Sequence, residues 1–314
     1  MFHGNVSAEI ATGLLALKER IAKAKIPSSQ IDETLNIATW NIREFGKKRR
    51  SEAAIHYIAE ILGQFDLIGL VELRDNLTDL QRVLPILGPY WRAIYSDAIL
   101  DAGGNRERVA YLYDKRAVVF NGLAAEASPP RVKKGAEYLS EESWWRSPYM
   151  ASFRAGNFDF VLLTTHIRWG EDEAGREREL SLLADWIEGK RKEKAHEDKD
   201  VIVMGDFNIP KLDSPLFKAI TKHGLQIPKA LTGLSFGSNL AKDKRYDQIL
   251  HHPIYPENFT NAGGIVDFLD TGVAPLFSGL SKEEFTFQMS DHLPLWIQIR
   301  TDIDGFQLEQ LING

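Results

Sequence analysis

Apolar and polar residues alternate along several short segments of this chain, the pattern of strands with one buried face. In the clearest case, every second residue from Leu293 to Ile299 is leucine or isoleucine. Short apolar runs bounded by polar residues or turn formers predict further strands at 35–41, 66–72, 108–114, 149–153, 158–166, 201–207 and 246–250. Because the run VIVMG within 201–207 is apolar on both parities, we expect that strand to be buried on both faces.

Between these runs, apolar residues recur at helical spacing and predict helices at about 51–63, 76–87, 176–194 and 214–222. A further helix at the N-terminus carries Ile10, Leu14, Leu17 and Ile21 on one face, which we expect to pack on the main body. The run 189–200 is highly charged and is typical of the solvated end of a helix. The segment 121–147 is interpreted as a long loop, and such loops are often functional.

The predicted helices and strands do not alternate strictly, and several strands follow one another directly. This order favours an α+β layered sandwich over a simple doubly wound sheet. Composition adds exclusions to this picture. The 314 residues include no cysteine, which excludes disulfides, thiolate nucleophiles and cysteine-based zinc sites, and fits a reducing compartment. The net charge of −6 provides no global positive field, so attraction for phosphate would have to come from local arginine clusters.

The N-terminal segment lacks the unbroken apolar core of a secretory signal, because Glu9, Lys18, Glu19 and Arg20 interrupt it. No apolar run in the sequence is long enough to cross a bilayer. We therefore expect a cytoplasmic protein without membrane association, and no obligate protein partner is indicated.

Polar side chains that can bind a metal or move a proton stand at the ends of the predicted strands. Taken singly, each is more commonly a turn former, a strand cap or a satisfied core histidine. A whole set at matching strand ends instead favours one shared site, and its carboxylate and amide oxygens suit magnesium or manganese better than zinc. The set comprises Asn41, Glu72, His166, Asp206, Asn208, Asp247, Asp291 and His292.

Seven segments occur in the order typical of the endonuclease/exonuclease/phosphatase superfamily, and the chain most resembles its deoxyribonuclease I-like branch. They are IATWNIREFG, LVELRD, RERVAYLYD, LTTHIRWG, MGDFN, RYDQIL and MSDHLP. The resemblance implies a four-layered α/β sandwich, with two packed mixed β-sheets flanked by helices and the site at one edge. It also implies an N-terminal helical extension at 1–34, a catalytic domain at 35–300 and a C-terminal tail at 301–314.

The same resemblance implies a metal site and the residues beside it. Glu72, with Asn41 and Asp291 nearby, looks like the site for Mg²⁺ or Mn²⁺, and Ca²⁺ is a further candidate. Asp206 and Asn208 look like the pair that orients the attacking water and the phosphate. A divalent cation at this place would stabilise the negative charge that develops during phosphodiester cleavage.

Two histidines are implied to be held by carboxylates. By resemblance, His166 is expected to pair with Asp247, and His292 with Glu107. A carboxylate fixes the tautomer of a histidine and raises its pKa, which suits it to proton transfer or to contact with phosphate. Which histidine acts as acid and which as base stays open.

The expected substrate is DNA, cleaved at phosphodiester bonds by an endonuclease. Arginine contacts phosphate bidentately, and six arginines lie in or beside the segments quoted above. They are Arg43, Arg74, Arg106, Arg108, Arg146 and Arg168. We expect about half of them to pair with nearby acids, and the first two to project beside the scissile phosphate.

Asn105 is a further candidate for substrate contact. It stands two residues before Glu107, where the resembling enzymes place a tyrosine that packs in the minor groove, and it would replace stacking by hydrogen bonds. Two alternatives stay open. One is a phosphatase or phosphodiesterase acting on a lipid headgroup or other small phosphoester; the other is a non-catalytic binding module, which the intact polar set disfavours.

Overall fold

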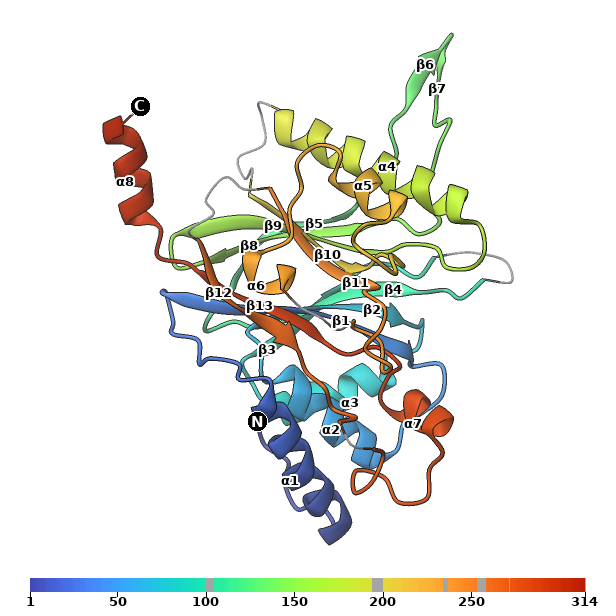
Figure 1. The fold of residues 1–314 in the computed structure, drawn as a ribbon, viewed down its shortest axis with the longest axis vertical. Coiled ribbons are helices and arrows are strands. Elements are labelled where there is room, and N and C mark those ends of the chain that lie inside the picture. Colours follow the sequence, from blue (N-terminus) through green and yellow to red (C-terminus); the bar gives the residue numbers. More distant parts are fainter. Residues whose placement is uncertain (100–103, 194–199, 234–236, 253–257, 271, 314) are drawn as a thin grey trace.

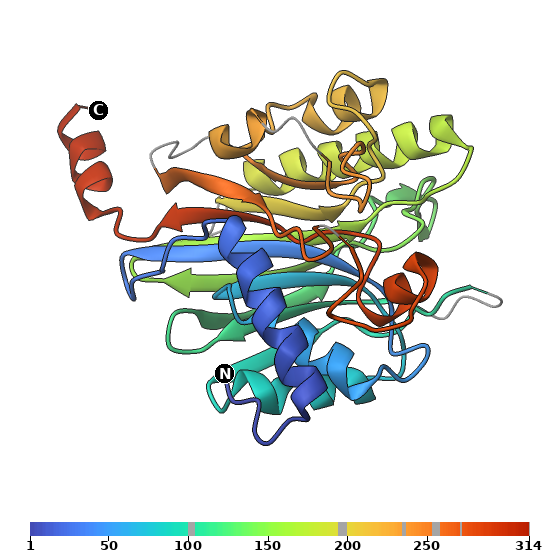
Figure 2. The same cartoon turned by 60° about the horizontal axis from the view of Figure 1, so that its bottom comes forward.

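The computed structural model describes residues 1–99, 104–193, 200–233, 237–252, 258–270 and 272–313. Two mixed β-sheets pack face to face, and helices cover the outer face of each (Figures 1 and 2). This arrangement is the layered sandwich that the order of elements predicts, in the four-layered form that the resemblance implies. In order across the sheet, the six strands of the first sheet are β12 (Phe259–Ile265), β13 (Leu295–Arg300), β1 (Thr34–Phe45), β2 (Leu67–Leu73), β4 (Arg108–Asp114) and β3 (Trp91–Tyr95).

The second sheet has five strands and its own covering helices. Its order is β11 (Asp247–His251), β10 (Val201–Asp206), β9 (Phe158–His166), β8 (Tyr149–Ala155) and β5 (Val119–Glu126). The outer helices are α1 (Ala8–Lys23), α2 (Glu52–Leu62) and α3 (Thr78–Leu87) on the first sheet, with α4 (Glu173–Lys192) and α5 (Pro215–Thr221) on the second. The remaining elements are β6 (Val132–Lys134), β7 (Glu137–Leu139), α6 (Lys229–Thr232), α7 (Lys282–Gln288) and α8 (Asp304–Asn313).

The apolar core lies between the sheets and continues beneath the outer helices. In β10, Ile202 and Met204 face the first sheet, while Val203 packs with α4 and α5, so this strand is buried on both faces as predicted. Helix α1 packs on the main body, as expected, through the buried side chains of Leu14 and Leu17. Among the described helices, none combines the length and apolar character needed to cross a membrane.

Two sequence interpretations need correction. The segment 121–147 is not one long loop, because β5 extends to Glu126 and a β6–β7 hairpin follows it. Strand β13 is not half-buried, since Trp296 and Gln298 on its second face are 2% and 7% exposed. The cause is its place inside the six-stranded sheet, between β12 and β1. Of the charged run 189–200, residues 194–199 lie outside the described part of the chain.

Candidate active site

The predicted strand-end residues gather at one edge of the sandwich because of strand direction. Strands β9 and β10 are parallel, which places His166 beside Asp206 at their carboxyl ends. Strands β1 and β2 are also parallel, and Asn41 and Glu72 end their apolar stretches at the same edge. Antiparallel strands begin where their neighbours end, so Asp247 at the start of β11 lies opposite Asp206.

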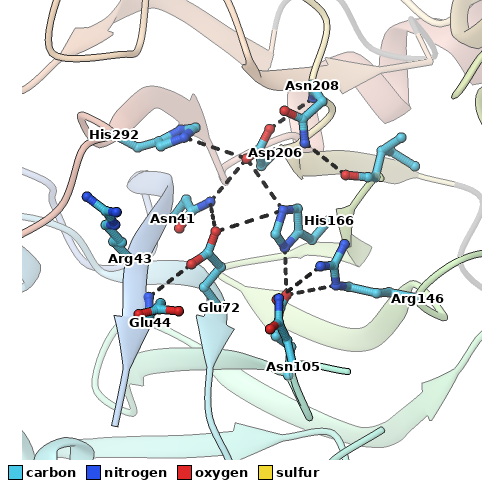
Figure 3. A network of polar contacts seen from close by, with 12 residues as sticks. Asn41, Arg43, Glu44, Glu72, Asn105, Arg146, His166, Asp206, Asn208 and His292 are labelled. Atoms are coloured by element: carbon cyan, nitrogen blue, oxygen red, sulfur yellow. Dashed lines mark hydrogen bonds and ion pairs between the residues drawn. The ribbon is translucent and has the colours of Figure 1, made fainter. Parts of the chain in front are cut away.

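Asp206 is the centre of the resulting polar network (Figure 3). Asn41 Nδ2 donates to Glu72 Oε1 at 3.0 Å and to Asp206 Oδ2 at 3.1 Å. The Nε2 atoms of His166 and His292 each lie 3.7 Å from that same Asp206 oxygen. His166 Nε2 is also 4.0 Å from Glu72 Oε1. Two imidazoles and two carboxylates therefore converge on one small volume.

Each histidine is held by a buried carboxylate, but the predicted pairing is wrong. His166 Nδ1 lies 2.8 Å from Glu107 Oε2, and His292 Nδ1 lies 2.7 Å from Asp247 Oδ2. The order of strands explains the exchange. Glu107 lies just before β4, a neighbour of β2, and β2 packs against β9, which ends at His166. Asp247 begins β11, which packs against β13, the strand that follows His292. Each acid therefore contacts the histidine that the facing sheet brings opposite it: Glu107 contacts His166 and Asp247 contacts His292.

Charges around His166 form a buried cluster. Arg146 donates to both oxygens of Glu107, at 2.8 and 3.0 Å, and Asn105 Nδ2 donates to one of them at 3.1 Å. Burial alone raises the pKa of the Glu107 carboxyl, but His166 and Arg146 outweigh burial and lower that pKa to about 2. Burial likewise opposes charge on His166, yet Glu107 and Asp206 raise the pKa of its imidazole. The cluster favours a charged pair.

His292 is in a comparable environment on the other side of Asp206. Burial lowers the pKa of its imidazole, while Asp247 and Asp206 raise it, and the balance lies well above the ordinary histidine value. Asp247 is in turn fixed by Ser238, whose hydroxyl donates to its Oδ2 at 2.6 Å. Asp291 adjoins His292 and its carboxylate adds to the upward shift of that pKa.

The backbone is strained where it delivers these side chains. Glu72, Asn208 and Glu44 have φ angles of 63°, 51° and 46°, in the left-handed region that residues other than glycine rarely adopt. The β1–β2 and β2–β4 pairings also shift register here, as β-bulges do beside active sites. Hydrogen bonds hold the strained residues, since Glu44 N donates to Glu72 Oε2 at 2.9 Å and Asn208 N to Asp206 Oδ1 at 2.9 Å. Such strain costs about 1–3 kcal/mol per residue and re-aims side chains toward the site.

Asn41 and Glu72 of the predicted metal site, together with Asp206, fit a divalent cation, whereas Asp291, the third predicted ligand, lies beside His292. Asn41 is 1% exposed, and its Oδ1 has no hydrogen-bond partner among the described residues. The Nδ2 of Asn41 faces the carboxylates of Glu72 and Asp206, and a flip of the side-chain amide would turn Oδ1 toward them and complete a set of hard oxygen ligands. Asp206, Asp247 and His292 form a second group whose ligand atoms lie within 4.8 Å of one another. His292 and Asp247 of this group are already hydrogen-bonded to each other through Nδ1 and Oδ2, so we favour the Asn41–Glu72 side.

The arginines are more heavily paired than predicted. Arg74 is 6% exposed and binds Glu44 at 2.8 Å and the carbonyl of Asn105, so its predicted projection beside the scissile phosphate is wrong. The side chain of Arg74 is redirected by the β-bulge in β2 around Glu72, which the sequence pattern does not reveal. Arg43 instead hydrogen-bonds Thr286 and lies 3.9 Å from the ring centroid of Phe287. Ion pairs join Arg106 to Asp75, Arg108 to Asp97, Arg146 to Glu107 and Arg168 to Glu179.

Sequence reasoning missed Ser290 and the basic run after β1. Ser290 Oγ donates to Asn41 O at 2.6 Å and accepts from the backbone N of Arg43 and His292, tying β1 to the His292 segment. Its place beside the Asp–His pair in MSDHLP was the available signal. Residues Lys47–Arg49 are exposed, and the letters KKR two residues after the β1 end could have identified them.

Comparison with known proteins adds independent findings. A model described as "Endonuclease/Exonuclease/phosphatase family" matches residues 38–292. The chain is 28% identical over 295 residues to a protein named Deoxyribonuclease from Thioalkalivibrio sp. (strain K90mix), covering 87% of this chain and 72% of that protein. It is 26% identical over 188 residues to Deoxyribonuclease-1 of Bos taurus, covering 57% and 62% respectively.

Solved structures show the same fold. A mannosyl-6-phosphatase of Bacteroides thetaiotaomicron superposes with a TM-score of 0.57 at 17% identity, covering 84% of this chain and 99% of that one. The human Nocturnin catalytic domain superposes with a TM-score of 0.54 at 15% identity, covering 87% and 96%. At these identities the likeness supports the architecture alone.

Proposed function

Because the chain belongs to the endonuclease/exonuclease/phosphatase family and is a phosphoesterase of that family, we propose that it hydrolyses DNA phosphodiester bonds as a divalent-cation-dependent endonuclease. One observation carries the chemistry: two carboxylate-held imidazoles approach Asp206 Oδ2 from opposite sides, each at 3.7 Å. This geometry offers two groups for proton transfer around one reacting phosphate.

The chain's own residues supply acid, base and charge stabilisation. Glu107 and Asp247 hold the Nδ1 atoms of their histidines, so both Nε2 atoms face the centre of the site. A positioned imidazole there can take a proton from water or give one to the leaving oxygen, a contribution of about 10²–10⁴-fold. Asp206 orients the attacking water, and imidazolium and amide N–H groups stabilise the developing phosphorane charge. The two histidines are equivalent in their distance from Asp206, so either can be the acid.

Asn41, Glu72 and Asp206 would hold Mg²⁺ or Mn²⁺, and the bound cation would neutralise charge on a phosphoryl oxygen. The relatives named deoxyribonuclease support DNA as substrate. The exposed residues Lys48 and Arg49, which follow β1, offer cations for the phosphates flanking the scissile one, whereas Lys47 pairs with Glu44. The alternative is a small phosphoester, favoured by the ion pairs that already engage most arginines near the site.

The test compares three substrates: supercoiled plasmid, a single-stranded oligonucleotide and bis-para-nitrophenyl phosphate. With Mg²⁺ or Mn²⁺ we expect nicking and cutting of DNA, and excess EDTA should abolish it. Undiminished cleavage in EDTA contradicts the metal requirement. Turnover of the small phosphoester without DNA cleavage establishes the alternative.

Histidine variants test the mechanism. His166→Ala and His292→Ala should each lower turnover by about two orders of magnitude or more. The matched control is His223→Ala, because His223 pairs with Asp185 at 2.7 Å on the surface, and wild-type activity is expected. Circular dichroism separates loss of chemistry from loss of fold. Folded histidine variants with full activity would refute the assignment.

A further inference from the structure

Two tryptophans on segments next to the site expose most of their surface. Trp145 is 60% exposed and Trp169 is 71% exposed. A cation lies beside one of them, since the guanidinium carbon of Arg168, the residue before Trp169, is 5.0 Å from the ring centroid of Trp145. A single exposed apolar residue needs no explanation, but two indoles grouped with an arginine form a surface that other flat rings can contact.

Buried contacts hold this surface in place. Glu179 of α4 has a fully buried side chain, and its carboxylate accepts from Trp145 N at 2.8 Å and from Arg168 Nε at 2.9 Å. The preceding residue, Trp144, packs edge-on against Trp186 at 6.2 Å and anchors the segment to α4. One buried acid therefore fixes both segments, and the indole of Trp145 remains outside as a result.

The same segments are tied to the catalytic residues. Arg146, directly after Trp145, binds Glu107, which holds His166. Trp169 follows His166 by three residues, so their Cα atoms are at most about 11 Å apart. These links place the segments that carry the two tryptophans next to His166.

We propose that Trp145, Arg168 and Trp169 form a tryptophan platform that stacks unpaired bases next to the scissile phosphate, making single-stranded or locally unpaired DNA the preferred substrate. This proposal rests on the proposed function and names its substrate class. In a duplex, the base faces are already stacked on one another and cannot reach an indole. On a single strand every base has an accessible face, and stacking on an aromatic residue is sequence-tolerant.

Charge supports this mode of binding. The chain carries a net charge of −6, and the Arg168 guanidinium is already neutralised by Glu179. Long-range attraction of phosphates is therefore weak, and contact energy must come from elsewhere. Stacking provides it without a long basic track.

Binding of a fluorescein-labelled oligothymidylate and of a duplex of equal length tests the platform, by anisotropy in EDTA to prevent cleavage. Each of Trp145→Ala and Trp169→Ala should raise the Kd for the single strand about 5- to 150-fold, the equivalent of 1–3 kcal/mol per base. The Kd for the duplex should change less than threefold. Trp145→Phe keeps an aromatic face and should retain most of the affinity. The matched control is Tyr138→Ala on the projecting β6–β7 hairpin (Figure 1), where the tyrosine is also 60% exposed.

The outcomes separate the two proposals. If the wild-type protein cleaves DNA and the folded alanine variants bind the single strand as tightly as it does, the platform is wrong and the function stands. Equal losses on both DNA forms would also overturn the platform. If the wild type neither binds nor cleaves DNA, the proposed function itself fails.

Discussion

The carboxylate of Glu107 should be the most sensitive single point in the charge cluster around His166. Its side chain is 4% exposed, and it binds an imidazole, a guanidinium and an amide at once. Glu107→Gln keeps the size and one oxygen but removes the charge. Arg146, 9% exposed in its side chain, then stays buried without a counter-charge.

Two lines of reasoning give the same magnitude for the loss of stability. The pKa of Glu107 falls from 4.5 to about 2, and each pKa unit corresponds to about 1.4 kcal/mol, so the ionised form gains about 3 kcal/mol from its surroundings. Removing one partner of a buried ion pair typically costs about 3–5 kcal/mol. We therefore expect Glu107→Gln to lower the free energy of unfolding at pH 7 by roughly 3 kcal/mol.

The pH dependence has a definite sign. Because the folded pKa is depressed, the stabilisation is fully present above pH 4.5 and is lost as the pH falls from 4.5 toward 2. Urea unfolding of wild type and Glu107→Gln should give the same difference in unfolding free energy at pH 7 and pH 5. The difference should be smaller at pH 3.5. A difference under 1 kcal/mol at pH 7, or one that does not shrink in acid, would refute the reasoning. Glu107→Asp should be intermediate, since it keeps the charge and shortens the reach.

Two further predictions concern packing and acid stability. In Gly69→Ala the new Cβ would lie 2.5 Å from Met204 Cε and 2.8 Å from Thr164 Oγ1 between the sheets, so unfolding in urea should show a loss of about 1–3 kcal/mol. Gly189→Ala is its control, because no atom lies within 4 Å of the added Cβ and alanine stabilises a helix by up to about 1 kcal/mol relative to glycine. An equal loss of stability in both variants would contradict the close-packing argument. Burial lowers the pKa of His251 to about 4, so wild-type stability should fall by about 3 kcal/mol as the pH drops from 6.5 to 4. His251→Gln should lack that component in urea unfolding across the same range, and an unchanged pH profile would show that the imidazole is not the cause.

Periodicity predicted most of the architecture because buried strands impose it. Strands β2, β9 and β10 end at or next to Glu72, His166 and Asp206, as their apolar runs predict. Strand β1 instead continues four residues past Asn41, to Phe45. Strand β12 was missed, because its residues FTNAGGI include two glycines and are only partly buried. No local pattern marks such a strand, which is formed by pairing with β13.

The site was predicted in its residues but not in its contacts. Which carboxylate pairs with which histidine depends on the strands that face each other across the sandwich. That order of strands cannot be deduced from the spacing of residues along the chain. The burial of Arg74 depends on the bulge that follows Glu72 and on Glu44, whose left-handed backbone turns its carboxylate toward the guanidinium. The division into 1–34, 35–300 and 301–314 stays a prediction, with β13 ending at Arg300.

Each histidine–carboxylate pair joins one sheet to the other. His166 and Asp247 belong to the second sheet, whereas Glu107 and His292 adjoin strands of the first. The site is therefore complete only while the two sheets are docked. A ligand that needs both halves binds the closed state alone and stabilises it by RT ln(1 + [L]/Kd). Substrate and cation would thus act as non-covalent cross-links along this edge, suppressing local opening of the sandwich where its backbone is most strained.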